Sequence, residues 1–171
     1  LYGEWCAPSL SEDVFEALRL AWASLEPYSN LVSLRDLHAE NIIWRPALRG
    51  LDQIGLLDFQ DAVLTHPVYD LVSLLRDARR DVGTETLETA KQRFIEGSGM
   101  DRAAFDKAFA VISAQRALRI LGIFERLITR DSKPKYAAFV PRVTAYLRQD
   151  LAHPALGEVA KYILPELDRH V

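Results

Sequence analysis

The sequence contains very little sulfur: among 171 residues, Cys6 is the one cysteine and Met100 the one methionine. A lone cysteine excludes an internal disulfide and a metal site built on paired cysteines, and it is compatible with a reducing compartment. We expect Cys6 to be a small apolar residue. Because the chain opens with Leu1 and has no methionine before Met100, we expect it to be part of a longer protein.

The sequence also lacks long apolar runs and clusters of one charge. No segment approaches the roughly 18 consecutive apolar residues that can cross a membrane, and no secretion signal opens the chain. The net charge is −3, with both signs scattered along the sequence. Because nucleic acids and membrane surfaces are bound by clustered Lys and Arg, we expect neither as a partner. These absences predict a soluble cytoplasmic protein in which residues 1–171 form a single domain.

The first third of the sequence predicts one helix followed by short strands. Ser9 and Glu12 have the spacing of a capping box that opens a helix, and Pro27 is expected to end it. Short apolar runs then indicate three strands, the last two forming a hairpin, at residues 31–34, 41–44 and 54–57. A small β element is therefore expected ahead of the remaining sequence.

The sequence from Pro67 onward has a helical pattern. Apolar residues recur at intervals of three and four, which predicts helices that begin near Pro67, Thr84 and Asp101. The first of these helices is expected to carry an apolar face from Val68 to Ala78. Prolines are expected to interrupt the remainder at positions 134, 154 and 165. The predicted fold class is α+β and mostly helical, with a small β-hairpin that holds polar loops.

Acidic and amide side chains gather around the predicted hairpin. Asp36 precedes its first strand, Asn41 opens that strand five residues later, and Asp58 follows its second strand. Taken singly, such residues commonly cap turns. Phosphoryl transfer from a nucleotide, however, needs a carboxylate that orients the attacking hydroxyl and oxygen ligands for Mg²⁺. A chain reversal between Asp36 and Asn41, with Asp58 beside Asn41 across the hairpin, would supply both.

The segments "LRDLHAENIIW" and "GLLDFQDAVLTHPVYDLVSLL" resemble the aminoglycoside phosphotransferase and choline kinase family of protein-kinase-like enzymes. The resemblance is closest to the bacterial N-acetylmuramate and N-acetylglucosamine kinases, and it is specific over residues 31–82. It implies the helix-rich C-terminal lobe of a protein-kinase-like fold. It also implies a small-molecule kinase that uses Mg²⁺ and moves the γ-phosphate of ATP to a hydroxyl of an amino sugar or aminoglycoside-like acceptor.

The resemblance also implies roles for individual residues. Asp36 corresponds to the catalytic base or hydroxyl-orienting carboxylate, and Asn41 and Asp58 correspond to the Mg²⁺ ligands. Asp70 corresponds to an aspartate that accepts backbone hydrogen bonds from the catalytic loop and holds it in place. Three more polar residues lie near the implied site without an assigned role: His38, Gln60 and Asp61. The acceptor-binding residues are not identified.

The sequence departs from the family pattern in two ways. Leu34 stands where the family commonly has a histidine, two residues before the catalytic aspartate. No glycine-rich hairpin and no Lys/Glu pair for the ATP phosphates precede the catalytic loop. We therefore expect an N-terminal lobe of the same protein to complete the nucleotide site, and this chain alone to be inactive.

Two other functions remain open from the sequence. One is a non-catalytic, pseudokinase-like binding module, which the presence of Leu34 and the missing lobe would fit. The other is a metal-dependent hydrolase that uses Asp36, His38, Asp58 and Asp61. It would require these side chains to converge on a transition metal.

Overall fold

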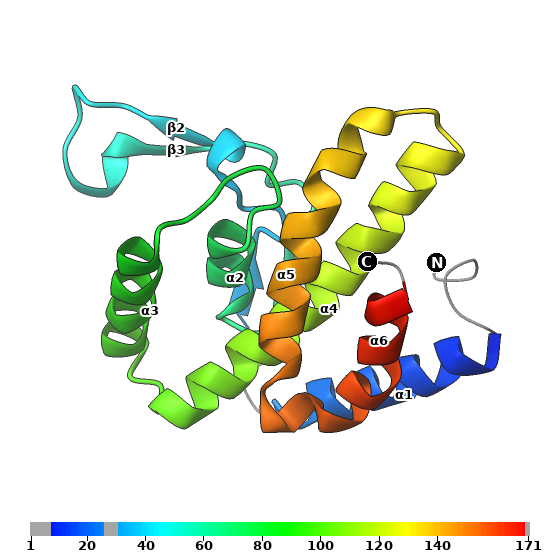
Figure 1. Cartoon of the computed structure of the whole chain (residues 1–171). Helices are drawn as coiled ribbons and strands as arrows, with labels where there is room; N and C mark the ends of the chain where they lie inside the picture. Colours follow the sequence, from blue (N-terminus) through cyan, green and yellow to red (C-terminus); the bar gives the residue numbers. More distant parts are fainter. Residues whose placement is uncertain (1–7, 26–30, 170–171) are drawn as a thin grey trace. The chain divides into compact units, whose positions relative to one another are not determined.

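A computed structural model describes residues 8–25 and 31–169 (Figure 1). The expectations for Cys6 and Pro27, and that for the side chain of Ser9, lie outside the described residues. Two compact units share the chain: a helical unit of residues 1–26 and 100–171, and a strand-bearing unit of residues 27–99. Within the described ranges, no helix is long and apolar enough to cross a membrane.

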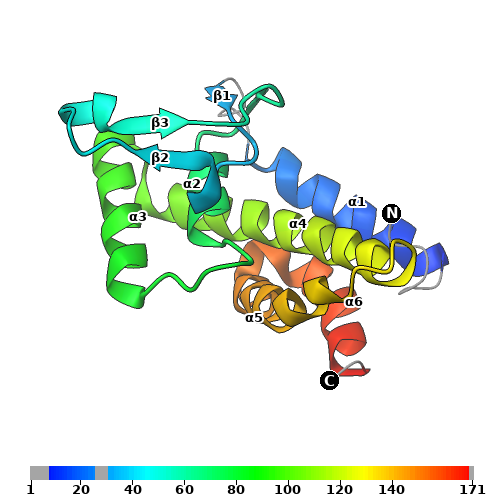
Figure 2. The same cartoon turned by 90° about the horizontal axis from the view of Figure 1, so that it is seen from above.

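The helical unit is built around one long helix, α4 (Arg102–Thr129). Asp101 caps its first turn, since the Asp101 side chain accepts a hydrogen bond from the Ala104 N–H at 3.0 Å. The unit also contains α1 (Pro8–Ala23), η3 (Pro134–Phe139), α5 (Val140–Leu151), η4 (Pro154–Leu156) and α6 (Gly157–Arg169), as Figure 2 shows from above. Helix α4 packs on α5 and η3, and α1 packs on α6.

The core of the helical unit consists of apolar side chains at helical spacing. Phe105 and Ile112 of α4, Leu147 of α5 and Leu156 of η4 are fully buried. Ring contacts continue this packing where α4 ends, because Phe124 lies 5.4 Å from Tyr136, centroid to centroid. Helical apolar residues are core here, as the sequence pattern indicated.

Proline positions were predicted only in part. Pro134 and Pro154 each begin a short 3₁₀ helix, but Pro165 lies inside α6, so the expected interruption there is wrong. The buried residues Val159, Ile163 and Leu167 are spaced four apart along α6. Packing of this continuous face maintains the helix although Pro165 has no N–H to donate.

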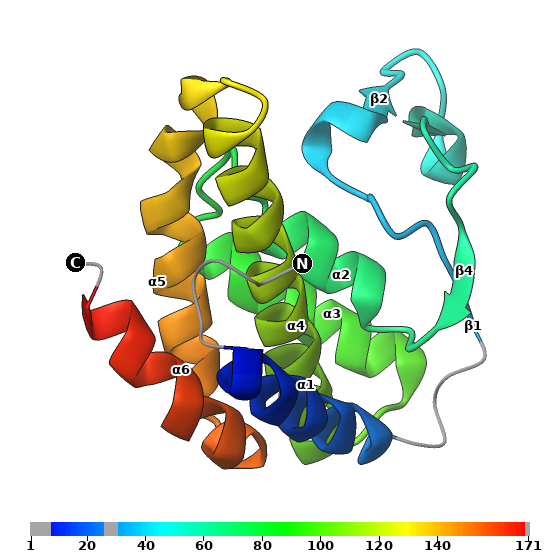
Figure 3. The ribbon, with the colours of Figure 1, turned by 90° about the vertical axis from the view of Figure 1, so that its right-hand side faces the viewer.

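The strand-bearing unit contains two separate two-stranded antiparallel sheets. Strand β2 (Ile42–Trp44) pairs with β3 (Ile54–Leu56), so that Ile43 lies opposite Gly55 (Figure 2). Strand β1 (Leu31–Ser33) pairs with β4 (Val63–Thr65), a strand that the sequence reading missed (Figure 3). Three residues show too little alternation to be recognised as a strand. Short 3₁₀ turns η1 (Ala39–Asn41) and η2 (Gly50–Gln53) precede β2 and β3.

Two helices complete the strand-bearing unit. Helix α3 (Thr84–Ser98) ends at Gly99, whose φ of 66° is in the left-handed region that glycine adopts without strain. Helix α2 (Tyr69–Leu75) is shorter than predicted and ends before Ala78. The Asp77 side chain accepts a hydrogen bond from the Arg79 N–H at 2.9 Å, which stabilises a turn where the helix would have continued.

Candidate active site

The loop between β1 and η1 is attached to helix α2 through one carboxylate. Asp70, in the first turn of α2, accepts three hydrogen bonds: from Ser33 Oγ at 2.7 Å, from the Leu34 N–H at 2.8 Å and from the Arg35 N–H at 3.0 Å. Charge-assisted bonds of this kind are the strong ones in proteins. These are the backbone hydrogen bonds that the family resemblance implies for Asp70; its importance for catalysis stays a prediction.

Arg35 has a backbone conformation that L residues seldom adopt. Its φ is 69°, in the left-handed region. The conformation lets two successive N–H groups, from Leu34 and Arg35, point at the same carboxylate. Because the bond from Leu34 is made by the backbone, a leucine in place of the family's histidine leaves it intact. The side chain of Asp36, which follows this turn, is 57% exposed.

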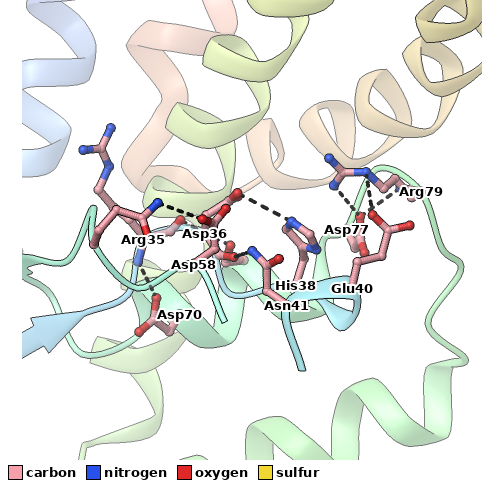
Figure 4. Close-up of polar contacts among 11 residues, drawn as sticks. Arg35, Asp36, His38, Glu40, Asn41, Asp58, Asp70, Asp77 and Arg79 are labelled. Atoms are coloured by element: carbon pink, nitrogen blue, oxygen red, sulfur yellow. Dashed lines mark hydrogen bonds and ion pairs between the residues drawn. The ribbon is translucent and has the colours of Figure 1, made fainter. Parts of the chain in front are cut away.

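Asn41 joins this loop to the hairpin. Its Nδ2 donates to the Asp36 carbonyl oxygen at 2.9 Å, and its own carbonyl oxygen accepts from the Leu57 N–H at 2.9 Å. The second bond extends the β2–β3 pairing by one step and puts Asp58, the next residue, beside Asn41. Figure 4 shows Asp36, Asn41 and Asp58 grouped together, with Asp70 apart from them and next to Arg35.

Asp58 also has a left-handed backbone, with φ of 59°. Its Oδ1 accepts a hydrogen bond from Gln60 Nε2 at 2.7 Å, so the structure brings Gln60 to the site. Asp61 is exposed, and within the described ranges no hydrogen bond or ion pair links it to the other site residues. In that part of the chain, Gln60 is therefore linked to the site by a hydrogen bond and Asp61 is not, although neither had an assigned role from the sequence.

His38 is the most deeply buried of the candidate polar residues, with 8% of its surface exposed. Its Nε2 lies 3.5 Å from Asp36 Oδ2. The other ring nitrogen, Nδ1, is buried and has no hydrogen-bond partner among the described residues. The sequence assigned His38 no role, because its burial and its approach to Asp36 follow from the fold of the loop.

An ionic cluster beside the site consists of Glu40, Asp77 and Arg79, and nothing in the sequence indicated that the last two lie there. Arg79 lies 3.6 Å from Glu40 of η1, measured from Nε to Oε2, and 3.6 Å from the buried Asp77, measured from Nη1 to Oδ1. Figure 4 shows the three side chains next to His38. Acidic and basic residues alternate in "RDARRD", a pattern typical of a solvated helix face, so the sequence carried no specific signal.

The donor atoms at the site suit a hard cation. Mg²⁺ takes oxygen ligands and keeps several waters, so one carboxylate and one amide oxygen suffice beside phosphate oxygens. Asn41 donates through Nδ2, which leaves its Oδ1 for a cation, and Asp58 has a second carboxylate oxygen besides the one bound to Gln60. These residues therefore fit Mg²⁺.

A transition-metal site is not supported by the same geometry. No group of three or more His, Cys, Asp or Glu side chains suited to hold a metal ion occurs in residues 8–25 and 31–169. The hydrolase hypothesis required Asp36, His38, Asp58 and Asp61 to converge in this way. It therefore loses its structural basis.

Comparison with known proteins gives two consistent results. A family model described as "Phosphotransferase enzyme family" matches residues 3–105. A protein of Caulobacter vibrioides named N-acetylmuramate/N-acetylglucosamine kinase is 41% identical over 181 residues, which cover 100% of this chain and 48% of that protein. Proteins of the same name from Pseudomonas putida and Neisseria meningitidis are 33% and 42% identical, over 70% and 56% of this chain and 38% and 30% of their own lengths. The chain spans about half the length of the Caulobacter relative.

Proposed function

Because this chain belongs to the phosphotransferase enzyme family, we propose that the whole protein transfers the γ-phosphate of ATP to a hydroxyl group of an amino sugar. One observation carries the proposal. The carboxylate-bearing loop and the end of the hairpin are joined by two hydrogen bonds, from Asn41 Nδ2 to the Asp36 carbonyl and from the Leu57 N–H to the Asn41 carbonyl. A hydroxyl-orienting carboxylate and two oxygen ligands are thereby grouped as phosphoryl transfer requires.

The roles of the site residues follow from their positions. Asp36 presents an exposed carboxylate that orients the acceptor hydroxyl and takes its proton as the bond to phosphorus forms. Asn41 and Asp58 hold Mg²⁺, which neutralises phosphate oxygens when bound. Asp70 holds the loop through the three hydrogen bonds that it accepts, so that the Asp36 carboxylate keeps its orientation while the acceptor binds.

The acceptor class rests on the relatives. Three proteins that match parts or all of this chain are named N-acetylmuramate/N-acetylglucosamine kinase. We extend that class to this protein, with N-acetylmuramate and N-acetylglucosamine as the first acceptors to test. We also expect the protein to act in the cytoplasm, and its nucleotide site to be completed by an N-terminal lobe, so that this chain alone does not turn over.

A pseudokinase-like binding module is the competing function. Leu34 in place of the family's loop histidine motivates it, but the loop bonds to Asp70 come from the backbone. The acid and both cation ligands of an active enzyme are also present in the sequence. These observations favour the enzyme.

The decisive experiment uses the full-length protein with Mg·ATP and a panel of acceptors that includes both sugars, an aminoglycoside and choline. We expect ADP release and a phosphosugar by ³¹P NMR with an amino sugar. Asp36→Asn should lower turnover by about 1,000-fold or more while calorimetry shows Mg·ATP binding within about twofold of wild type.

Asp52→Asn is the matched control, because Asp52 is an exposed aspartate of η2. It should leave turnover unchanged. Nucleotide binding without phosphorylation of any acceptor would establish the binding module instead. Full turnover by the Asp36→Asn protein would remove Asp36 from the mechanism.

A further inference from the structure

We propose that His38 is a positioning residue, which holds the Asp36 carboxylate in the orientation that the acceptor hydroxyl needs. The inference rests on the phosphotransfer function proposed above. His38 precedes η1, and its Nε2 is 3.5 Å from Asp36 Oδ2. Catalytic hydrogen bonds are often this long before substrate binds and shorten in the reactive complex.

The burial of the two side chains differs sharply. The His38 side chain is 10% exposed, whereas that of Asp36 is 57% exposed. An acceptor sugar can therefore reach the Asp36 carboxylate from solvent, while His38 lies behind it. Figure 4 shows the imidazole directed at Asp36 from the side of η1. This arrangement favours an action of His38 through Asp36 over direct contact with the acceptor.

The ring nitrogens indicate why a histidine occupies this position. A nearby carboxylate oxygen favours the proton on Nε2, so that Nε2–H faces Asp36 and can donate to it once the 3.5 Å separation shortens, while Nδ1 is left as an acceptor. Nδ1 is buried and has no hydrogen-bond partner within the described part of the chain. An unpaired buried polar atom destabilises a protein, so packing alone would be served better by an apolar residue such as leucine. The interaction with Asp36 explains why a histidine occupies position 38.

The consequence for the reaction concerns the two carboxylate oxygens of Asp36. His38 engages Oδ2, and the Asp36 backbone carbonyl is held separately by Asn41 Nδ2 at 2.9 Å. When the bond from Nε2 to Oδ2 forms in the reactive complex, the backbone and one carboxylate oxygen are both held, and Oδ1 is left for the acceptor hydroxyl. The proton leaves that hydroxyl for Asp36 as its oxygen attacks the γ-phosphorus, and the bond from that phosphorus to the bridging oxygen breaks so that ADP leaves. His38 takes no part in the proton transfer.

Three single variants of the full-length protein test the orientation. His38→Leu should lower kcat on the order of 10- to 100-fold, with the KM for ATP within about twofold of wild type. His38→Gln should recover to within about fivefold of wild type, because its amide nitrogen can donate from nearly the position of Nε2. His153→Leu is the matched control, since His153 caps η4 in the helical unit and should leave kcat unchanged. Thermal melting of each variant reports on folding.

A double-mutant cycle with Asp36 separates positioning from direct action on phosphate. In the Asp36→Asn background, adding His38→Leu should change the residual rate by less than about twofold, because His38 acts only through the carboxylate. A further 10-fold loss in that background, on the order of the effect of the single variant, would assign His38 an independent contact with the phosphate and overturn the proposal. Wild-type kcat in His38→Leu would overturn it as well.

Failure of the underlying function would look different. If no acceptor is phosphorylated by the wild-type protein, or if Asp36→Asn is fully active, phosphotransfer through Asp36 is wrong and the role of His38 falls with it. If wild type is active and Asp36→Asn is not, phosphotransfer through Asp36 stands. The double-mutant cycle of Asp36→Asn with His38→Leu then tests the role of His38 separately. Should His38→Leu fold poorly, His38→Gln in both backgrounds still gives the comparison. Its predicted loss is below about fivefold in wild type and below about twofold in Asp36→Asn, and a larger loss in Asp36→Asn would overturn the proposal.

Discussion

In the helical unit Phe105, Ile112 and Leu147 are completely or almost completely buried, whereas in the strand-bearing unit Val32, Trp44 and Leu64 are 69%, 59% and 67% exposed. The short strands thus expose the kinds of side chain that α4 and α5 bury, although α2, in the same unit as the strands, buries Val72 and Leu75. Buried apolar area is the main favourable term in folding, at about 25 cal/mol per Å². The helical unit is therefore stabilised mainly by its core.

The candidate active site lies entirely in the strand-bearing unit, where hydrogen bonds do most of the ordering. Three bonds to Asp70, one from Asn41 Nδ2 and one from Gln60 fix the loops that carry Asp36 and Asp58. Two of the residues concerned, Arg35 and Asp58, have left-handed backbones, which such bonds must stabilise. The helical core and the candidate site therefore lie in different units, and we expect stability and turnover to respond to different mutations.

Paired leucine substitutions give the largest expected contrast. Leu147→Ala, at a fully buried position of α5, should lower the free energy of unfolding by about 3–4 kcal/mol. Leu64→Ala removes the same atoms from a 67% exposed position of β4 and should cost less than about 1 kcal/mol. Urea denaturation of this chain measures both values. Equal losses would mean that β4 is packed as tightly as the helical core.

Paired aspartate substitutions test the division between stability and chemistry. Asp70→Asn removes an acceptor from the bonds to Ser33, Leu34 and Arg35, and should cost about 2 kcal/mol of stability together with an order-of-magnitude loss of kcat. Asp150→Asn weakens the buried hydrogen bond from Ser113 in the helical unit. It should lower stability to a similar degree, of about 1–3 kcal/mol, with kcat unchanged.

The measurement for this pair combines chemical denaturation with steady-state kinetics of the full-length protein. A loss of kcat in Asp150→Asn would show that the helical unit contributes to the chemistry. Unchanged kcat in Asp70→Asn would show that the loop does not depend on Asp70 for its conformation.

A smaller effect is expected from pH at the start of α2. Burial lowers the pKa of His66 to about 4, and the neutral His66 accepts a hydrogen bond at Nδ1 from the Val68 N–H. The unfolded chain takes up this proton near pH 6.5 and the folded chain only near pH 4. Stability from this residue is therefore complete above about pH 6.5 and decreases as the pH falls toward 4, by about 1–2 kcal/mol at about pH 5.

Urea denaturation at about pH 7.5 and about pH 5 measures this change. His66→Asn is the informative variant, because it keeps a side-chain acceptor near Val68 and does not titrate. The stability of wild type relative to the variant should fall by about 1–2 kcal/mol between about pH 7.5 and about pH 5, because only wild type has the buried histidine. A difference that is independent of pH would contradict the burial of a neutral His66.

Local features were largely predictable from the sequence. The spacing of Asp36, Asn41 and Asp58, read with the motifs around them, indicated the family that the comparison confirms. The helix predicted to begin near Thr84 corresponds to α3. The mostly helical class with small antiparallel sheets also agrees with the structure. Each of these signals lies within a short segment or in a recognisable motif.

Features that depend on tertiary contacts were not predictable. Strand β4 is defined by its pairing with β1, a segment distant in the sequence. The early end of α2 is different, because Asp77 bonds the Arg79 N–H locally while the apolar spacing continues to Ala78. The ion pair between Arg79 and Glu40 joins segments that are far apart in the sequence. The burial of His38 depends on the residues packed around it. A single sequence contains no signal for such contacts. Of the supporting residues, Asp70 was therefore indicated by the family motif, whereas the contacts of His38 and Arg79 appeared only in the structure.

The left-handed backbone at Asp58 has a consequence for engineering this position. Among L residues, Asn and Asp tolerate that region best, and glycine adopts it without cost. An alanine at position 58 would thus report conformational strain and the lost carboxylate at once. Asparagine removes the charge and keeps the backbone preference, whereas glycine removes the side chain and relaxes the backbone. A saturation library at this codon can be interpreted only with those two residues as its reference points.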